Sequence, residues 1–304
     1  MSHSLTSQPY LFSEVDKIVR QVLFGRTNFN EVINRLNKFY CSFMNAFESD
    51  LLYSRSIYAF ISSTSMAVGD SYPSEVIWDH NKVQRFAGTL SFYKKEIVNE
   101  DSAWRYQEGV NRRSLSIYIN SLIKHYARLL FVRVDLKYSK ESRQLVTLDD
   151  FHDHMTKLRN LISNKKTCFK HLQGYAWALE QGYKNGGLHC HLLLIYDGAS
   201  QDNDWYLAEE VKKKWLAITE GLGYAHNCNN AKSKKKHELK GTLGVGMIHR
   251  NDPQQVANAN KTALYLTKPS KKGQHLKVML PSMRTFGHGE YRNTKRRGLT
   301  PIAN

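Results

Sequence analysis

Two histidines separated by one residue, His189 and His191, open an apolar segment that continues to Tyr196. In an extended strand, residues i and i+2 point to the same face, so the two imidazoles would project together while Cys190 faces a core on the other side. Histidine is a common metal ligand near neutral pH, and a bound divalent ion can polarise a phosphoryl oxygen. The pair therefore predicts a metal site that could act on phosphodiesters.

A carboxylate, Glu180, lies nine residues before His189, at the end of a shorter segment that also reads as a strand. An antiparallel turn through Gly186 would bring this carboxylate beside the histidines. A set of two histidines and one glutamate suits Mg²⁺ or Mn²⁺ with open coordination positions, whereas a structural zinc ion would use four protein ligands. The alternative is that Glu180 is an exposed charge at the end of its strand.

A second pair with the same spacing, His152 and His154, provides a comparison. Thr147 and Asp150 have the spacing of a capping box, which predicts a helix from there to about Ile162. In a helix, residues i and i+2 point roughly 200° apart. We therefore expect no metal chelation by this second pair.

A possible nucleophile, Tyr265, lies three residues before Lys268 in a segment whose pattern predicts a helix over 253–267. On one helical face, the lysine could stabilise a phenolate or the charge on a phosphoryl oxygen. A tyrosine that attacks phosphorus becomes covalently linked to it. The pattern alone is weak, because the chain has 17 tyrosines and most would serve packing.

The positive charge of the chain, +17 in total, is concentrated near its C-terminal end: residues 231–297 hold 16 basic and 3 acidic side chains. A single lysine run is often only a solvated loop, but several basic clusters around one phosphodiester site favour a polyanion. The residues that we expect to contact nucleic acid are Lys232, Lys234, Lys235, Lys236, Lys261, Lys271, Lys272, Arg284, Arg292, Lys295 and Arg296.

The elements that would position these residues divide into two regions. Residues 1–110 have helical apolar spacing, with helical pieces expected over 47–61 and 83–97, and are interpreted as an accessory domain. Residues 111–304 mix expected helices (116–126, 147–162, 205–222, 253–267) with expected strands (129–138, 175–180, 188–196, 245–249). This arrangement predicts an α+β sheet domain.

Composition restricts the class of protein further. No apolar stretch approaches the roughly 18 residues of a membrane helix, and the N-terminal segment lacks the pattern of a signal peptide. The four cysteines form no C-x-x-C motif, so neither a disulfide framework nor a zinc ribbon is predicted. We expect a protein of the cytoplasm with no membrane partner.

Taken in order, these motifs resemble the HUH endonucleases, which include rolling-circle replication initiators. The segments WALEQGYKNGGLHCHLLLIYDG, WLAITEGLGYAHNCN, GVGMI, ALYLTK and RTFGHGEYR are similar to those of inovirus-type replication proteins, grouped with the YagK/YfjJ C-terminal domain. The resemblance covers about residues 128–295. It implies a central antiparallel sheet with an RRM-like core, metal ligands His189, His191 and Glu180, and Tyr265 as nucleophile with Lys268 beside it. Because Lys261 stands four residues before Tyr265, a single-tyrosine enzyme is implied.

The same resemblance implies that residues 111–304 form a DNA-nicking domain, encoded by a phage or prophage and acting in the bacterial cytoplasm. Such an enzyme would cut and rejoin single-stranded DNA at an origin hairpin through a 5′-phosphotyrosyl intermediate. The chain has no G-x-x-x-x-G-K-[ST] motif, so a host helicase would separate the strands and a host polymerase would extend the 3′ end. The alternatives are a single-tyrosine transposase or relaxase, and a nucleic-acid-binding protein without nuclease activity.

Overall fold

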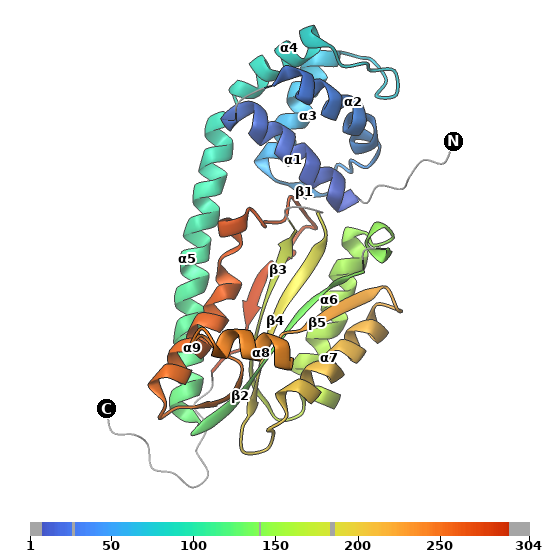
Figure 1. Cartoon of the computed structure of the whole chain (residues 1–304). Helices are drawn as coiled ribbons and strands as arrows, with labels where there is room; N and C mark the ends of the chain where they lie inside the picture. Colours follow the sequence, from blue (N-terminus) through green and yellow to red (C-terminus); the bar gives the residue numbers. More distant parts are fainter. Residues whose placement is uncertain (1–7, 26–27, 140, 183–185, 292–304) are drawn as a thin grey trace.

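The computed structural model describes residues 8–25, 28–139, 141–182 and 186–291. It confirms a mixed fold in which a group of N-terminal helices lies at one end of an antiparallel sheet that is flanked by helices (Figure 1). Among the described residues, no helix combines the length and the apolar character that crossing a membrane requires.

The N-terminal group consists of four helices whose apolar stripes face one another. Their bounds are α1 (Gln8–Phe24), α2 (Phe29–Asn45), α3 (Arg55–Val68) and α4 (His80–Ser91). The Asn28 side chain caps α2 and the Asp79 side chain caps α4 by accepting hydrogen bonds from backbone N–H groups of the first turn. The helix expected over 47–61 begins only at Arg55, because the residues just before it form a short strand, β1 (Leu52–Tyr53).

A single long helix, α5 (Lys94–His125), connects this group to the sheet and runs along its side (Figure 1). It passes through residue 110 without a break and is much longer than the helix expected over 116–126. The first half of α5 is difficult to predict from the sequence, because most of its side chains are exposed and it therefore lacks a clear helical spacing of apolar residues.

The central sheet has the strand order β5-β2-β4-β3-β8, with β6 pairing beside β5 on the same edge of β2. All these pairings are antiparallel. The strands are β2 (Arg128–Tyr138), β3 (Leu172–Gln181), β4 (Leu188–Asp197), β5 (Gly223–Asn227), β6 (Gly246–His249) and β8 (Phe286–His288). A separate two-stranded sheet pairs β1 with β7 (Val278–Met279).

Helices cover both faces of the sheet, so β4 is buried on both sides. On one face, Cys190, Leu192 and Leu194 belong to a core that includes side chains of α6 (Leu148–Ser163) and α7 (Asp204–Ile218). On the other face, Leu193 and Ile195 pack with side chains of α5 and α9 (Pro253–Leu264). The two-residue alternation therefore places His189 and His191 on the α5–α9 side.

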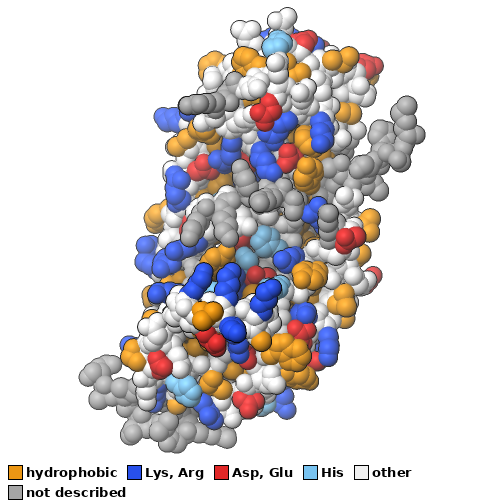
Figure 2. Space-filling model, viewed as in Figure 1, with side chains coloured by type: hydrophobic (Ala, Val, Ile, Leu, Met, Phe, Trp, Pro, Cys, Tyr) orange, Lys and Arg blue, Asp and Glu red, His pale blue; other side chains and the backbone are white. Residues whose placement is uncertain are grey.

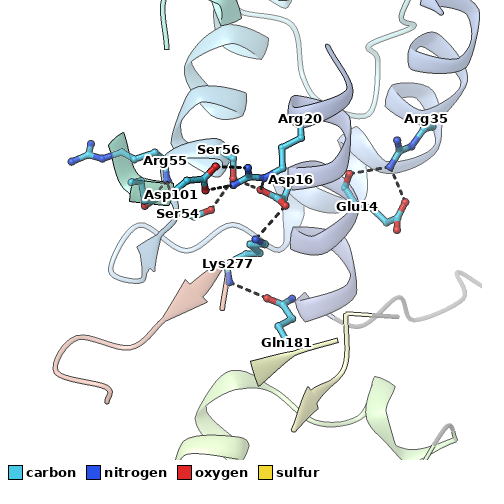
Figure 3. Close-up of polar contacts among 11 residues, drawn as sticks. Glu14, Asp16, Arg20, Arg35, Ser54, Arg55, Ser56, Asp101, Gln181 and Lys277 are labelled. Atoms are coloured by element: carbon cyan, nitrogen blue, oxygen red, sulfur yellow. Dashed lines mark hydrogen bonds and ion pairs between the residues drawn. The ribbon is translucent and has the colours of Figure 1, made fainter. Parts of the chain in front are cut away.

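The N-terminal helices are joined to the sheet domain by buried polar contacts (Figure 3). Lys277 is 5% exposed; its Nζ lies 3.3 Å from Asp16 of α1, and its backbone N–H donates to Gln181 at 2.9 Å. Gln181 in turn donates from Nε2 to the carbonyl of Pro9 at 2.6 Å. Because Gln181 follows Glu180 in β3, this joint lies directly beside the predicted metal ligand.

Candidate metal centre and tyrosine

The β3–β4 hairpin brings the three predicted metal ligands together. In its antiparallel register Glu180 stands opposite His189, and His191 follows two residues later on the same face. Gly186 enters the hairpin with φ +63°, and a side chain there would clash with Pro9 and Tyr10 of α1, so glycine is required. The predicted turn through this glycine is therefore confirmed.

The ligand atoms converge on one point. Glu180 Oε2 lies 3.4 Å from His189 Nε2 and 3.3 Å from His191 Nε2, and one ligand atom of each residue falls within 4.8 Å of the others. Glu180 is 2% exposed, and its Oε2 is buried without a hydrogen-bond partner among the described residues. A buried carboxylate oxygen that faces two imidazole nitrogens fits a divalent cation with mixed nitrogen and oxygen ligands.

The other ring nitrogen of each histidine faces an acceptor. His191 Nδ1 lies 2.6 Å from Asp135 Oδ1 of β2, and His189 Nδ1 lies 3.3 Å from the carbonyl of Gly187. An acceptor at Nδ1 favours the proton there and leaves the lone pair of Nε2 directed at the ligand position. This pairing of carboxylate and histidine is typical of metal sites in proteins.

The charges around the cluster favour a cation. Burial alone would raise the pKa of Glu180, but His189 and His191 lower it to about 2, so the carboxylate is ionised. Burial is likewise outweighed at Asp135, whose pKa is held below its usual range by His191 and Arg133. At His191, burial lowers the pKa, but the two carboxylates outweigh it and raise the pKa. The space between the carboxylates thus stabilises positive charge, which either a proton or a metal ion could supply.

Tyr265 lies beside this cluster. Its ring centroid is 5.6 Å from that of His191 in an edge-on arrangement, and the guanidinium carbon of Arg133 lies 4.7 Å from the centroid of the phenol ring. The expected α-helix ends at Leu264, and Tyr265 begins a short 3-10 turn, η3 (Tyr265–Thr267). The helix expected over 253–267 is therefore three residues shorter. Lys268 follows the turn with an exposed side chain, and its role beside the phenol stays a prediction, while Arg133 is a cation that contacts the phenol ring.

Comparison with known proteins places the chain in a family. The profile of the YagK/YfjJ C-terminal domain matches residues 89–289, about two thirds of the 304 residues. The chain belongs to this family. Comparison with curated proteins and with solved structures gave no significant match. The matched region begins upstream of residue 110, where the sequence pattern predicts the domain boundary. It contains α5, strands β2 to β8 and the three candidate metal ligands Glu180, His189 and His191.

The basic residues expected to contact nucleic acid fall into three groups, and all but Arg292, Lys295 and Arg296 lie within the matched residues 89–289. Those exposed are Lys232, Lys235 and Lys236 of α8 (Ala231–Glu238), together with Lys261 and Arg284. Lysine and arginine side chains gather over α8 on the face where histidine side chains are also visible (Figure 2). Lys234 differs, since its Nζ lies 2.7 Å from the buried carboxylate of Asp204 and forms an ion pair with it. The side chains of Lys271 and Lys272, and the residues Arg292, Lys295 and Arg296, lie outside what the structure describes.

Two residues of the site were not assigned from the sequence. Neither Arg133 nor Asp135 is among the predicted ligands and catalytic residues, yet Arg133 Nη2 lies 3.3 Å from Asp135 Oδ1 and both contact His191. Their spacing could have identified them, because Arg133 and Asp135 are alternate residues of the largely apolar strand β2 and therefore lie on the same face of the sheet. Two charged residues on such a face suggest a polar site at that end of the sheet.

The comparison pair lies in a helix, as predicted. His152 and His154 lie in α6, and the predicted capping box of Thr147 and Asp150 is confirmed at its start. His154 is buried and its Nδ1 lies 2.8 Å from the hydroxyl of Tyr138. This histidine therefore serves the core on the opposite face of the sheet.

Proposed function

We propose that this chain is a metal-dependent, single-tyrosine DNA endonuclease of the HUH superfamily that nicks and rejoins single-stranded DNA at a replication origin. The observation that carries the proposal is the contact of Tyr265 with His191, which puts a phenol beside two histidines and a buried carboxylate. A structural metal site would have no need of a tyrosine and an arginine at its edge. The order of motifs shared with rolling-circle initiators supports the same reaction.

Each residue of the site has a role in this reaction. Glu180, His189 and His191 would hold Mg²⁺ or Mn²⁺, which when bound polarises and orients the scissile phosphate. Tyr265 forms a bond to phosphorus while the bond from phosphorus to the 3′ oxygen breaks; the phenol loses its proton and the 3′ oxygen gains one. The product is a 5′-phosphotyrosyl protein and a 3′-hydroxyl, and attack by a new 3′-hydroxyl reverses the step.

Arg133 supplies the fixed positive charge in this proposal. Burial opposes its charge, but Asp135 outweighs burial and raises the pKa of Arg133, so the guanidinium stays charged. From its position over the phenol ring it can stabilise negative charge that develops on the phosphoryl oxygens. The exposed lysines of α8 would hold the strand as it approaches, and a host helicase and polymerase would complete replication.

The experiment is to incubate labelled single-stranded DNA with the protein and Mn²⁺ and to look for a covalent adduct after denaturation. We expect an adduct that Tyr265→Phe abolishes and that Tyr206→Phe retains, because Tyr206 lies exposed on α7, on the opposite face of the sheet. Tight DNA binding with no adduct under any divalent metal would instead indicate a binding protein without nuclease activity.

A further inference from the structure

We propose that a cavity beside Tyr265 receives one nucleobase of the strand that is cut, an inference that rests on the proposed function. The cavity lies between α5 and the edge of the sheet formed by β3 and β8, and it has a volume of about 700 Å³. Ligand pockets commonly have volumes of ~300–1,000 Å³. We call it the base cavity.

The base cavity is lined by residues that adjoin the proposed metal centre and Tyr265. Ala178, which lines it, is the neighbour of His191 across β3 and β4. Leu266 and Thr267, which also line it, directly follow Tyr265 in the 3-10 turn. A strand whose phosphate lies between Tyr265 and the metal ligands could therefore place an adjacent base in this cavity.

Flat rings line the base cavity. Trp104 of α5 and His275 are stacked, with ring centroids 4.4 Å apart and planes 21° apart. Phe286 and His288 of β8 line it as well, and His288 is stacked on Tyr118. Aromatic side chains bind unpaired bases by stacking on their π faces, and they do so with every base.

Polar groups along α5 could contact the edge of a base. The side chains of Gln107 and Asn111 line the base cavity and are joined by a hydrogen bond of 3.0 Å. Side-chain amides both donate and accept hydrogen bonds, which matches the mixed donors and acceptors on base edges.

The charges of the lining favour a base over a phosphate. Glu108 lies in the lining, where its carboxylate accepts hydrogen bonds from the backbone and hydroxyl of Ser270. Glu290 and Arg284 also line the cavity, but both are exposed, so Glu108 is the acidic group of its more buried part. A carboxylate repels a phosphate but tolerates a neutral ring, so the base would enter while the backbone remains outside near Arg284.

The test compares two short oligonucleotides of equal length, one with bases and one with abasic sites throughout. Binding to the full chain carrying Tyr265→Phe is measured in EDTA, so that neither metal nor chemistry contributes. We expect Asn111→Trp, which fills the base cavity, and Phe286→Ala, which removes a stacking surface, to weaken binding of the base-bearing strand about tenfold, in the range for one stacked base. Binding of the abasic strand should not change.

The matched control is Tyr106→Trp, which adds a similar ring to an exposed position of α5 outside the base cavity and should leave both affinities unchanged. The inference is overturned if both cavity variants bind the base-bearing strand as well as the parent does, or if they lose both strands equally. If the variants fail to fold, the parent chain provides the test through the fluorescence of Trp104, which is the part of the emission that Trp104→Phe removes. Base-bearing DNA should quench this fluorescence and abasic DNA should not. Absence of that quenching overturns the inference. Failure of the nickase proposal would show separately, in the adduct assay.

Discussion

At the scale of single residues, Asp135 would set the properties of the proposed metal centre without contacting the ion. Its carboxylate lies 2.6 Å from His191 Nδ1 and directs Nε2 of that ring at the ligand position. We predict that Asp135→Asn weakens Mn²⁺ binding about 10- to 100-fold, as loss of such partners does in other metal sites. Titration calorimetry with Mn²⁺ measures this, with Asp153→Asn on the exposed side of α6 as the control. Equal affinity in the parent and Asp135→Asn would contradict this role.

His154 allows a prediction about stability and pH. Burial lowers its pKa in the folded protein below the ordinary value of 6.5. Between the ordinary pKa of 6.5 and the lower pKa of the folded protein, the unfolded chain binds a proton at His154 that the folded chain does not. The free energy of unfolding therefore falls as the pH falls below 6.5, by at most about 1.4 kcal/mol per pH unit. Urea unfolding at several pH values should show that His154→Gln reduces this dependence while His152→Gln preserves it. A slope unchanged by His154→Gln would show that another group is responsible.

At the scale of elements, α9 positions Tyr265 by packing on the sheet. Ala263, two residues before the tyrosine, is fully buried against the face that carries His191. We predict that Ala263→Leu costs ~1–3 kcal/mol of stability through overpacking and also lowers the yield of covalent adduct, since the 3-10 turn must shift. The exposed Ala257→Leu on the same helix is the control for both measurements. Full adduct yield in Ala263→Leu would mean that the tyrosine is not held by this contact.

Helix α8 offers a second test at this scale, because its lysines differ in their surroundings. Lys235 and Lys236 are exposed, while Lys234 is paired with Asp204. If the exposed pair contacts single-stranded DNA, replacing both with alanine should reduce the slope of log affinity against log salt by about 1.4, from ~0.7 for each phosphate contact. Lys234→Ala should instead lower the melting temperature. An unchanged salt dependence in the double variant would exclude α8 from the DNA path.

The elements also show which parts of the fold a sequence can reveal. The β3–β4 hairpin and α6 follow from apolar periodicity, glycines and a capping box, so the candidate ligands could be predicted with their register. Strands β1, β5, β7 and β8 have two to five residues, too few to show a period, and they form because a neighbouring strand offers a free edge. Arg133 was missed for a related reason: its contact with Tyr265 joins residues that are distant in the chain.

The whole molecule behaves as one packed unit in which the N-terminal helices support the site. A single apolar core continues from α1 and α2 into the sheet, and the buried pair of Lys277 with Asp16 crosses the same junction. Removing Lys277 would leave the buried Asp16 carboxylate with a second cation, Arg20, whose Nε lies 2.9 Å from it. We therefore predict that Lys277→Met lowers the free energy of unfolding by about 3 kcal/mol, the lower end of the range for breaking a buried pair. The thermal transition of the full chain should move down as one step, whereas Lys82→Met, at an exposed pair, should not move it. Two separate transitions would contradict a single unit.

The central claim is that Tyr265 is the residue that becomes linked to DNA. The most direct measurement is mass spectrometry of the adduct after digestion with nuclease and trypsin. The peptide of residues 262–271, TALYLTKPSK, contains Tyr265 as its one tyrosine, because trypsin does not cut between Lys268 and Pro269. We predict that this peptide carries the mass of a nucleotide 5′-phosphate on Tyr265, in a reaction that requires Mg²⁺ or Mn²⁺ and is lost in His191→Ala. A modification on another tyrosine, or unmodified peptide from protein that binds single-stranded DNA with metal present, would contradict the account.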